Sequence, residues 1–427
     1  MKYNIFTLCI LVLGLPFLVS AQKNKKPQVL VYGSDIAAYA AALQSVKSGV
    51  PTIWITDRDT LVPKFSLQAQ SIPNSSDRDG GVWLDILMDM ALSTTRDDVL
   101  AATVRNDMRP RLFMNALERS LTKYPTLQVM KKQQIRALKP SSKGWLVTLA
   151  NKQKLELRCV IDASTEQELQ HLFAANDVTT ADNMNLLKTA EISKEQWRTQ
   201  VVSGSVTGDC YTLTLAQLLT AEKQGLFNLV AMQKLLEMDK SVVSFRSAIG
   251  QAVGATAAYL AFFKTTPEKI DARKLQLELL TYGVHIIPFQ DIPSMDPHFN
   301  AIQRFALAGI LPYTINAGLP VFDKKGEVRA KTFEVLLKQL YSRSQLWFAD
   351  YQGDVLTVGD VLSLVKFIGM RGEEVDRQVA NDWNDNLRFD GKFDPHAAIT
   401  RYQFAVLLDR YANPFAKAVI QKGVFIN

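Results

Sequence analysis

The chain has 427 residues, of which 47% are hydrophobic and 21% charged, an ordinary globular composition with enough apolar residues for a large core. The formal net charge of +7 is mild and scattered, and no basic patch with interleaved aromatic residues is present. These properties predict two or three folded domains and argue against a nucleic-acid partner.

The first 21 residues are predicted to be a secretory signal peptide. Lys2 gives a basic start, residues 5–19 are mostly apolar, and Val19-Ser20-Ala21 is a small-residue cleavage site. The apolar run is short for a membrane span, and no later segment is long enough to be one. We therefore expect an exported protein of the periplasm or cell envelope, beginning at Gln22 and without a transmembrane anchor.

After this leader, the sequence predicts one β-α-β unit of about 30 residues, the layout typical of dinucleotide binding. Residues 28–33 predict a short buried strand, and residues 52–57 predict a second one. Between them, Tyr39–Ser48 is an Ala-rich segment that predicts a helix, which Gly49-Val50-Pro51 ends. The turn Gly33–Ala38 joins the first strand to this helix.

A second motif is the helix predicted over Ser247–Ala261, which has small side chains on one face. Gly250 and Gly254 are four residues apart and open this face. Such a face lets a planar ligand approach closely, and the helix N-terminus favours an anionic or electron-rich group. The alternative is a tightly packed helix pair, and the spacing alone leaves both possibilities open.

Together with Cys159–Leu169, which carries Ile161-Asp162-Ala163, these segments resemble the FAD-dependent oxidoreductases of glutathione-reductase-type fold. More narrowly, they resemble a secreted bacterial group. In that group the first turn is Tyr-Gly-Gly-Thr-Pro-Ala-Gly, a strand ends in Ile-Asp-Ala-Thr-Gly-Asp, and a Gly-Gln-Ala-x-Gly helix faces the isoalloxazine. The resemblance covers roughly residues 27–285 and implies FAD as cofactor. The cofactor-binding residues that it implies are Gly33, Ser34, Ala37, Ala38, Asp162, Ala163, Gly250, Gln251 and Gly254.

Three departures from the family pattern predict weakened cofactor binding. Asp35 puts a negative charge where it would face the pyrophosphate, and Coulomb repulsion opposes binding. Thr56 stands where an acidic residue would bind the ribose hydroxyls, and Asp57 next to it points to the other face of a continuing strand. Ser164-Thr165 replaces the family's Thr-Gly.

The remaining N-terminal segments predict helices and a β-meander. Helices are expected over 85–92, 97–105 and 109–123, and strands over 127–130, 135–138, 145–149 and 155–160, with a hairpin turn at 150–153. The substrate region, 164–243, is short for the family and mostly predicts helix, as at 215–223 and 226–238. No residue in it can be named as a catalytic acid or base.

Cysteines and histidines give no sign of metal or redox chemistry. Cys159 and Cys210 remain after removal of the leader, and they could pair. However, Cys159 falls in a predicted buried strand, which favours an unpaired buried thiol. The four histidines, His171, His285, His298 and His396, lack metal-ligand spacing, so we predict no metal site.

The C-terminal third resembles S-layer-homology modules. Asp291-Ile292-Pro293 and His298 match the start of such a module, and residues 393–408 match its end, including Ile399-Thr400-Arg401. A weaker copy of that end lies at 327–337. The sequence thus predicts two helical modules, at 291–341 and 355–415, with Thr400 as a helix N-cap.

In the resembled modules the Thr-Arg pair lines a groove for cell-wall glycan. In this chain Gln403 replaces the acid that accompanies the pair in the family. In the first copy, Arg329-Ala330 stands in place of the Thr-Arg pair. Packing against the flavin-type domain is the alternative use of these modules.

We therefore expect an α/β fold with a Rossmann-like FAD/NAD(P)-binding domain and a β-meander, followed by an all-α C-terminal region. The predicted division is a signal peptide at 1–21, an oxidoreductase-like domain at 27–285 and S-layer-homology-like modules at 286–427. The first functional hypothesis is an exported FAD-dependent oxidoreductase with impaired cofactor binding and an unknown small-molecule substrate. The alternative is a non-catalytic envelope protein that uses this scaffold to bind glycan or a protein partner.

Overall fold

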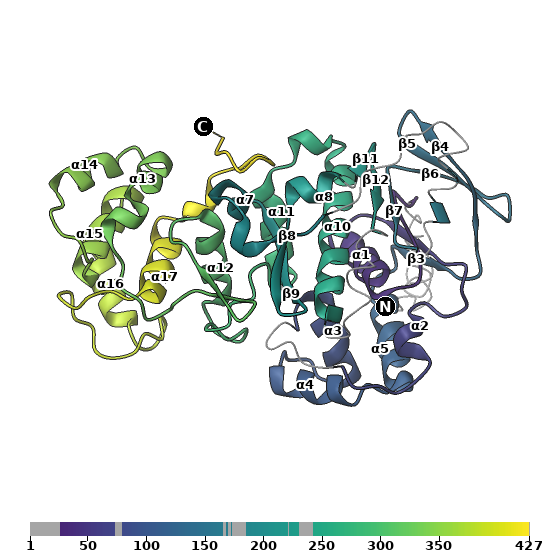
Figure 1. Ribbon diagram of the computed structural model, residues 1–427, viewed down its shortest axis with the longest axis horizontal. Coiled ribbons are helices and arrows are strands. Elements are labelled where there is room, and N and C mark those ends of the chain that lie inside the picture. Colours follow the sequence, from purple (N-terminus) through teal and green to yellow (C-terminus); the bar gives the residue numbers. More distant parts are fainter. Residues whose placement is uncertain are drawn as a thin grey trace, which may run out of the picture.

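The structure, a computed structural model, describes residues 26–72, 79–164, 168–169, 172, 185–220, 222–229 and 242–426. The molecule is elongated, with an α/β part at one end and a helical part at the other (Figure 1). The predicted fold class is confirmed, while the predicted signal peptide lies outside the described residues. Within them, no helix is long and apolar enough to cross a membrane.

The α/β part is built on a six-stranded sheet with the order β11-β12-β7-β1-β2-β3. Every pairing in it is parallel except that between β11 and β12. The strands are β1 (Val29–Tyr32), β2 (Thr52–Ile55), β3 (Leu127–Met130), β7 (Cys159–Asp162), β11 (Glu222–Lys223) and β12 (Leu226–Asn228). The central strands are continuous apolar runs because both faces of this sheet are covered.

Alternate residues of each central strand enter two different cores. Val29 and Val31 of β1 pack with the helices, whereas Leu30 and Tyr32 pack with the β-meander on the other face. The helices of this part are α1 (Ile36–Lys47), α2 (Pro63–Ser66), α3 (Gly81–Met90), α4 (Asp98–Asn106), α5 (Pro110–Thr122) and α10 (Val243–Phe263). This period-two alternation positions α1 and α10 directly over the sheet.

The predicted β-meander is confirmed as β4 (Ile135–Ser141), β5 (Gly144–Leu149) and β6 (Lys154–Leu157). The single strand predicted over 155–160 is in fact two. Arg158 separates β6 from β7, because its backbone N–H donates to the carbonyl of Gln28 (2.8 Å) and directs β7 into the parallel sheet beside β1.

The helix predicted over 215–223 is present as α8 (Leu215–Thr220), but the predicted helical character is wrong for most of the described rest of residues 164–243. An antiparallel sheet, order β8-β10-β9, is formed by β8 (Leu187–Lys188), β9 (Gln200–Val206) and β10 (Asp209–Thr214). The short helices α7 (Lys194–Arg198) and α8 (Leu215–Thr220) flank it. The helix predicted over 226–238 is contradicted at its start, because Leu226–Asn228 is β12, a buried strand that extends the parallel sheet beside β7. Residues 230–238 lie outside the described residues.

The C-terminal region is helical, with one added hairpin. It contains α12 (Phe299–Ala308), α13 (Ala330–Leu340), α14 (Ser344–Asp350), α15 (Val358–Gly369), α16 (Glu374–Asp382) and α17 (Arg401–Tyr411), whereas α11 (Ala272–Thr281) packs on α10 and β9 of the α/β part. The hairpin pairs β13 (Thr314–Asn316) with β14 (Leu319–Val321). One hydrophobic cluster continues across the predicted boundary at residue 285 into this region, so the two parts share a core.

The helical region is organised around three repeats, where the sequence predicts two modules. Each repeat is a short extended segment that leads into a helix: 327–329 before α13, 355–357 before α15 and 398–400 before α17. Isolated bridges join the segments in a closed ring, Arg329 to Val355, Thr357 to Ala398 and Thr400 to Glu327. The middle residues, Val328, Leu356 and Ile399, are all buried.

Two of the three repeat helices begin with the same cap. The predicted N-cap Thr400 is confirmed and forms a capping box with Gln403, so the residue that replaces the family's acid closes the helix start. In the middle repeat Thr357 forms the equivalent box with Asp360. The middle repeat was not predicted because it lacks the Thr-Arg pair, although it keeps the cap and the apolar spacing.

The C-terminal tail fastens the helical region to the α/β part. The backbone N–H of Ala272 donates to the carbonyl of Val419 (3.0 Å), and the guanidinium of Arg198 donates to the carbonyl of Gly423 (3.2 Å). The Arg273 guanidinium lies over the ring of Phe415. This arrangement realises the predicted alternative in which the C-terminal region packs against the first domain.

The ring of three segments predicts a strong dependence of stability on its central side chains. Ile399→Ala should lower the free energy of unfolding by about 2–5 kcal/mol, because it leaves a cavity where the segments meet. Val335→Ala, at a position that is 71% exposed on α13, is the matched control and should change it by less than about 0.5 kcal/mol. Urea unfolding of both variants measures this, and equal effects would contradict the ring as the centre of the region.

Candidate functional site

The candidate site lies where the order of the parallel strands reverses. The chain passes from β1 to β2 on one side, and β7 lies on the other side of β1. Ligands of open α/β sheets bind beyond the carboxyl ends of the strands at such a point. Two of the predicted segments meet there, since Gly33 follows β1 and Ala163 follows β7.

The turn after β1 is in direct contact with the end of β7. Gly33 has a φ of +134°, and a Cβ at this position would overlap the carbonyl of Ala163. The Gly33 carbonyl accepts a buried hydrogen bond from the indole N–H of Trp54 (2.8 Å). The glycine is thus required by backbone conformation and by the neighbouring chain, independently of any ligand.

A buried ion pair closes the start of α1. Asp35 is the N-cap residue of α1, but its carboxylate does not accept a hydrogen bond from the first turn of the helix. It accepts one from the Nη2 of Arg246, in the first turn of α10, and the two side chains are 9% and 6% exposed. The N-terminus of a helix favours an anion, and here the chain supplies its own. The charge that was expected to face a pyrophosphate is therefore compensated within the protein.

The small-residue face of α10 packs against α1. A Cβ on Gly250 would overlap the backbone of Ala37, and one on Gly254 would overlap the backbone of Ala41. The hydroxyl of Ser45 donates to the carbonyl of Gly254 (3.1 Å). Of the two possibilities that the spacing leaves open, the structure has the tightly packed helix pair at these positions, and this face has no room for a planar ligand.

Gln251, another predicted cofactor residue, joins three helices. Its Oε1 accepts from the backbone N–H of Val82 (3.0 Å) in α3, and its Nε2 donates to the Oε1 of Gln44 (2.7 Å) in α1. The side chain is completely buried. Its hydrogen-bonding groups are therefore engaged within the protein.

Asp162 and Ser164 form the polar end of β7. Oδ1 of Asp162 accepts from the backbone N–H (3.0 Å) and the hydroxyl (2.7 Å) of Ser164, whereas Oδ2 has no hydrogen-bond partner. The side chain is 1% exposed, and burial raises its pKa to about 6, against the lowering effect of the Ser164 hydrogen bonds. Nearby, the hydroxyl of Tyr32 donates to Glu168 (2.5 Å).

The end of β2 lacks the group expected for a ribose. Thr56 is fully buried, and its hydroxyl oxygen accepts from the backbone N–H of Arg58 (3.1 Å). Asp57 is exposed. Neither side chain provides a buried carboxylate at the position where a nucleotide-binding acid would stand.

Taken together, the residues present do not fit the pyrophosphate of FAD. The first turn of α1 is covered by protein, with Ile36 and Ala38 at most 1% exposed. Ser34 is half-buried, and Ala37 faces α10. The carboxylate of Asp35 already occupies the N-terminal end of α1, and Thr56 stands where the acid that binds a ribose would be. Among the described residues, Oδ2 of Asp162 is one polar atom near the strand ends that has no hydrogen-bond partner and could accept from a ligand hydroxyl.

Sequence reasoning missed Arg246. Its signal was a cation one turn before Gly250, at the start of a helix otherwise composed of apolar and small residues. An arginine that precedes such a helix needs a partner once the helix is buried, and Asp35 is the acid in the other predicted motif. Pairing this arginine with Asp35, the acid in the turn Gly33–Ala38, would have found the contact.

The surroundings of the described cysteines, and of His285 and His298, indicate structural roles. Cys159 and Cys210 are buried and not joined in a disulfide, as predicted for Cys159, whose pKa burial raises to about 12. The sulfur of Cys210 accepts a hydrogen bond from the hydroxyl of Thr189 (3.2 Å). His298 shares a hydrogen bond with the carbonyl of Leu387 (2.9 Å), and His285 packs edge-on against Phe299. His171 lies outside the described residues, and among those described no cluster could hold a metal ion.

No protein-family model matches the chain, and no curated protein matches it. Chains of known structure that are similar to parts of it number 446, and three of them serve as examples. They are the bacillithiol disulfide reductase Bdr from Staphylococcus aureus (TM-score 0.24, 16% identity, 33% of this chain and 38% of that one), OTEMO with FAD bound (0.22, 12%, 33% and 26%) and the tetracycline destructase Tet(51) (0.25, 14%, 39% and 44%). The chain thus spans less than half the length of each, and matches of this extent say nothing about activity.

The buried ion pair predicts non-additive mutational effects. Asp35→Ala and Arg246→Met should each lower the free energy of unfolding by about 3–5 kcal/mol, because each leaves an unpaired buried charge. The double variant should lose less than the sum of the two. Denaturant unfolding closes this cycle, with the exposed pair Lys132 and Asp59 as a control that should show a coupling below about 1 kcal/mol. Additive effects at Asp35 and Arg246 would contradict the pairing.

The raised pKa of Asp162 predicts a specific pH dependence of stability. The folded state keeps a proton on this carboxyl between its ordinary pKa of 3.8 and about 6, whereas the unfolded state loses it. The contribution to stability is therefore full below pH 3.8 and falls as pH rises to about 6, by roughly 3 kcal/mol for a shift of about two pKa units. Asp162→Asn should remove this part of the pH profile. Unfolding free energies of both proteins at several pH values test it, and parallel profiles would refute it.

Proposed function

We propose that this protein is an exported, non-catalytic envelope protein, in which a flavoprotein-type scaffold carries a C-terminal region that binds cell-wall glycan. The single observation that carries the non-catalytic part is the buried ion pair between Asp35 and Arg246. It places a carboxylate of the chain at the helix end where a dinucleotide pyrophosphate would bind. The packing of Gly250 and Gly254 against α1 supports the same conclusion.

The glycan part of the proposal is supported by the resemblance of residues 291–415 to S-layer-homology modules. Arg401, which matches the arginine of the motif, donates to the carbonyls of Phe322 (2.9 Å) and Pro312 and lies over the ring of Phe322. We therefore assign Arg401 to joining the start of α17 to the chain on either side of the β13–β14 hairpin. The proposal gives glycan binding to the three-repeat region as a whole and not to this side chain.

A second candidate is the FAD-dependent oxidoreductase. Asp162 favours it, because its unpartnered Oδ2 lies at the strand-order reversal, where a cofactor hydroxyl could donate to it. Against it stand the covered start of α1 and the missing ribose acid. The described part of residues 164–243 supplies no acid–base pair that could be assigned to a substrate.

One preparation of the mature protein tests both parts of the proposal. It should be colourless and give no saturable heat when titrated with FAD or ADP, because the chain's own carboxylate fills the anion position. It should also sediment with purified cell-wall polysaccharide and be released by soluble fragments of the same glycan. Stoichiometric FAD in the purified protein would favour the oxidoreductase, and failure to sediment would refute the glycan part.

A further inference from the structure

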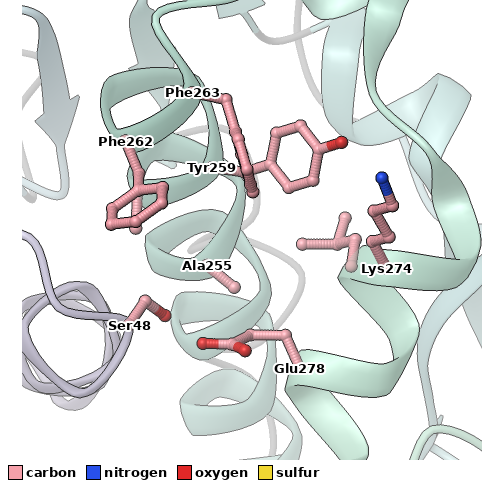
Figure 2. A pocket seen from close by; sticks show the side chains of 9 residues that line it. Ser48, Ala255, Tyr259, Phe262, Phe263, Lys274 and Glu278 are labelled. Carbon is pink, nitrogen blue, oxygen red and sulfur yellow. The ribbon is translucent and has the colours of Figure 1, made fainter.

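A pocket of about 220 Å³ lies between α10 and α11, at the edge of the sheet opposite the candidate site (Figure 2). It lies at this edge because Ser48, the C-cap residue of α1, lines it, and α1 runs from the carboxyl end of β1 to the amino end of β2. Neither residue of the buried ion pair lines it, nor does any residue of β7. A ligand in this pocket is therefore separate from the dinucleotide layout.

Aromatic side chains form one side of the pocket. Tyr259, Phe262 and Phe263, near the end of α10, all line it. The ring of Phe263 contacts the rings of Phe262 (centroids 5.1 Å apart) and Tyr259 (4.7 Å). Phe262 and Phe263 are 60% and 56% exposed, whereas almost all other residues of α10 are buried. An exposed aromatic cluster beside a pocket indicates a place where a ligand binds.

The pocket also contains a half-buried carboxylate. Glu278 of α11 lines it, and within the described part of the chain this side chain has no ion pair or hydrogen bond. Lys274, one turn earlier on α11, lines the pocket too but is exposed. In Figure 2 the carboxylate of Glu278 extends toward Ser48, whereas the ammonium of Lys274 lies at the other end of the pocket. Solvent screens the charge of Lys274, so the carboxylate is the charge that the pocket partly removes from water.

Two helices end at this pocket, and their dipoles have the same sign there as the carboxylate. Ser48 is the C-cap of α1, and Phe262 and Phe263 are the last two residues of α10. The C-terminus of a helix carries a partial negative charge that favours a cation, and aromatic ring faces attract a cation as well. Lys264, the C-cap of α10, is exposed and does not line the pocket. The carboxylate, the helix ends and the rings therefore all favour a cation with apolar groups.

The size and polarity of the pocket limit which cation fits. Water occupies about 30 Å³ per heavy atom in the liquid, so a volume of about 220 Å³ holds roughly seven heavy atoms. This is the size of choline, and it is too small for a peptide or a nucleotide. Among the described residues that line the pocket, Glu278 is the one carboxylate. A quaternary ammonium ion suits such a place, because its nitrogen has no hydrogen to donate and needs only a counter-charge and ring faces.

We propose that this pocket binds a small quaternary ammonium ion of the size of choline. The trimethylammonium group lies beside Ala255, which Figure 2 shows between the ring of Phe262 and the carboxylate of Glu278. Ala255 leaves space there because its side chain is a single methyl group. Lys274 takes no part in binding, because its ammonium is at the other end of the pocket and repels a cation. The inference is independent of glycan binding and of the state of the dinucleotide site.

Titration calorimetry of the mature full-length protein with choline and with 3,3-dimethylbutanol tests the proposal. The two compounds have nearly the same shape, because a carbon atom in the alcohol replaces the nitrogen of choline, but only choline is charged. We expect saturable one-to-one binding of choline and at least about tenfold weaker binding of the alcohol, which gains neither the attraction of the carboxylate nor that of the ring faces.

Substitutions in the pocket separate the contributions of charge and ring. Glu278→Gln should weaken choline binding by about tenfold or more, because it removes the counter-charge. Phe262→Leu keeps an apolar side chain but removes the ring face, and it should weaken binding by roughly three- to fivefold. The matched control is Lys274→Gln, which removes the other charge on the same helix and should leave the affinity unchanged or raise it. These positions are exposed or half-buried, so the variants should fold.

Absence of saturable choline binding by the wild type would overturn the proposal. Equal affinity for choline and the neutral alcohol would overturn it as well, because the pocket would then select by shape alone. So would unchanged binding in Glu278→Gln, or a loss in Lys274→Gln as large as that in Glu278→Gln, because the carboxylate would then not be the group that recognises the ligand.

Discussion

The contact between α1 and α10 is the constraint on which the α/β part depends. The two helices touch backbone to backbone, which only Gly250 and Gly254 on one side and alanines on the other permit. This approach fixes the N-terminus of α10 beside the N-terminus of α1. Arg246 therefore reaches Asp35, and Gln251 reaches both α1 and α3. A wider separation of the helices would break all of these interactions together.

In this arrangement a dinucleotide layout carries a carboxylate of its own at the start of the first helix. In such a site the N–H groups and dipole of the first helix attract a ligand phosphate. Here the carboxylate of Asp35 satisfies the dipole, and Arg246 compensates the carboxylate. Both charges are buried, so removing one partner exposes the other to an apolar environment. The ion pair is therefore maintained both by the attraction between the two charges and by the cost of leaving either charge buried without its partner.

The sequence alone was enough to predict those parts of the structure that depend on residues close together in the chain. The unit β1-α1-β2, the helices α4 and α5, the meander and the cap at Thr400 all follow from spacing and turn residues. It was insufficient where distant segments meet. Asp35 and Arg246 are 211 positions apart, and β12 is a strand only because β7 lies beside it. The middle repeat likewise becomes visible through its bridges to the other two segments.

The two ends of α10 have opposite roles, and the difference follows from what each meets. At its N-terminus a buried arginine requires a counter-ion, which the chain provides in Asp35. At its C-terminus the helix extends past the sheet, and Phe262 and Phe263 have no covering element among the described residues. Open α/β sheets normally bind at the carboxyl edge of their strands. In this chain an internal ion pair occupies part of that edge, whereas the exposed aromatic side chains of α10 lie at the amino edge.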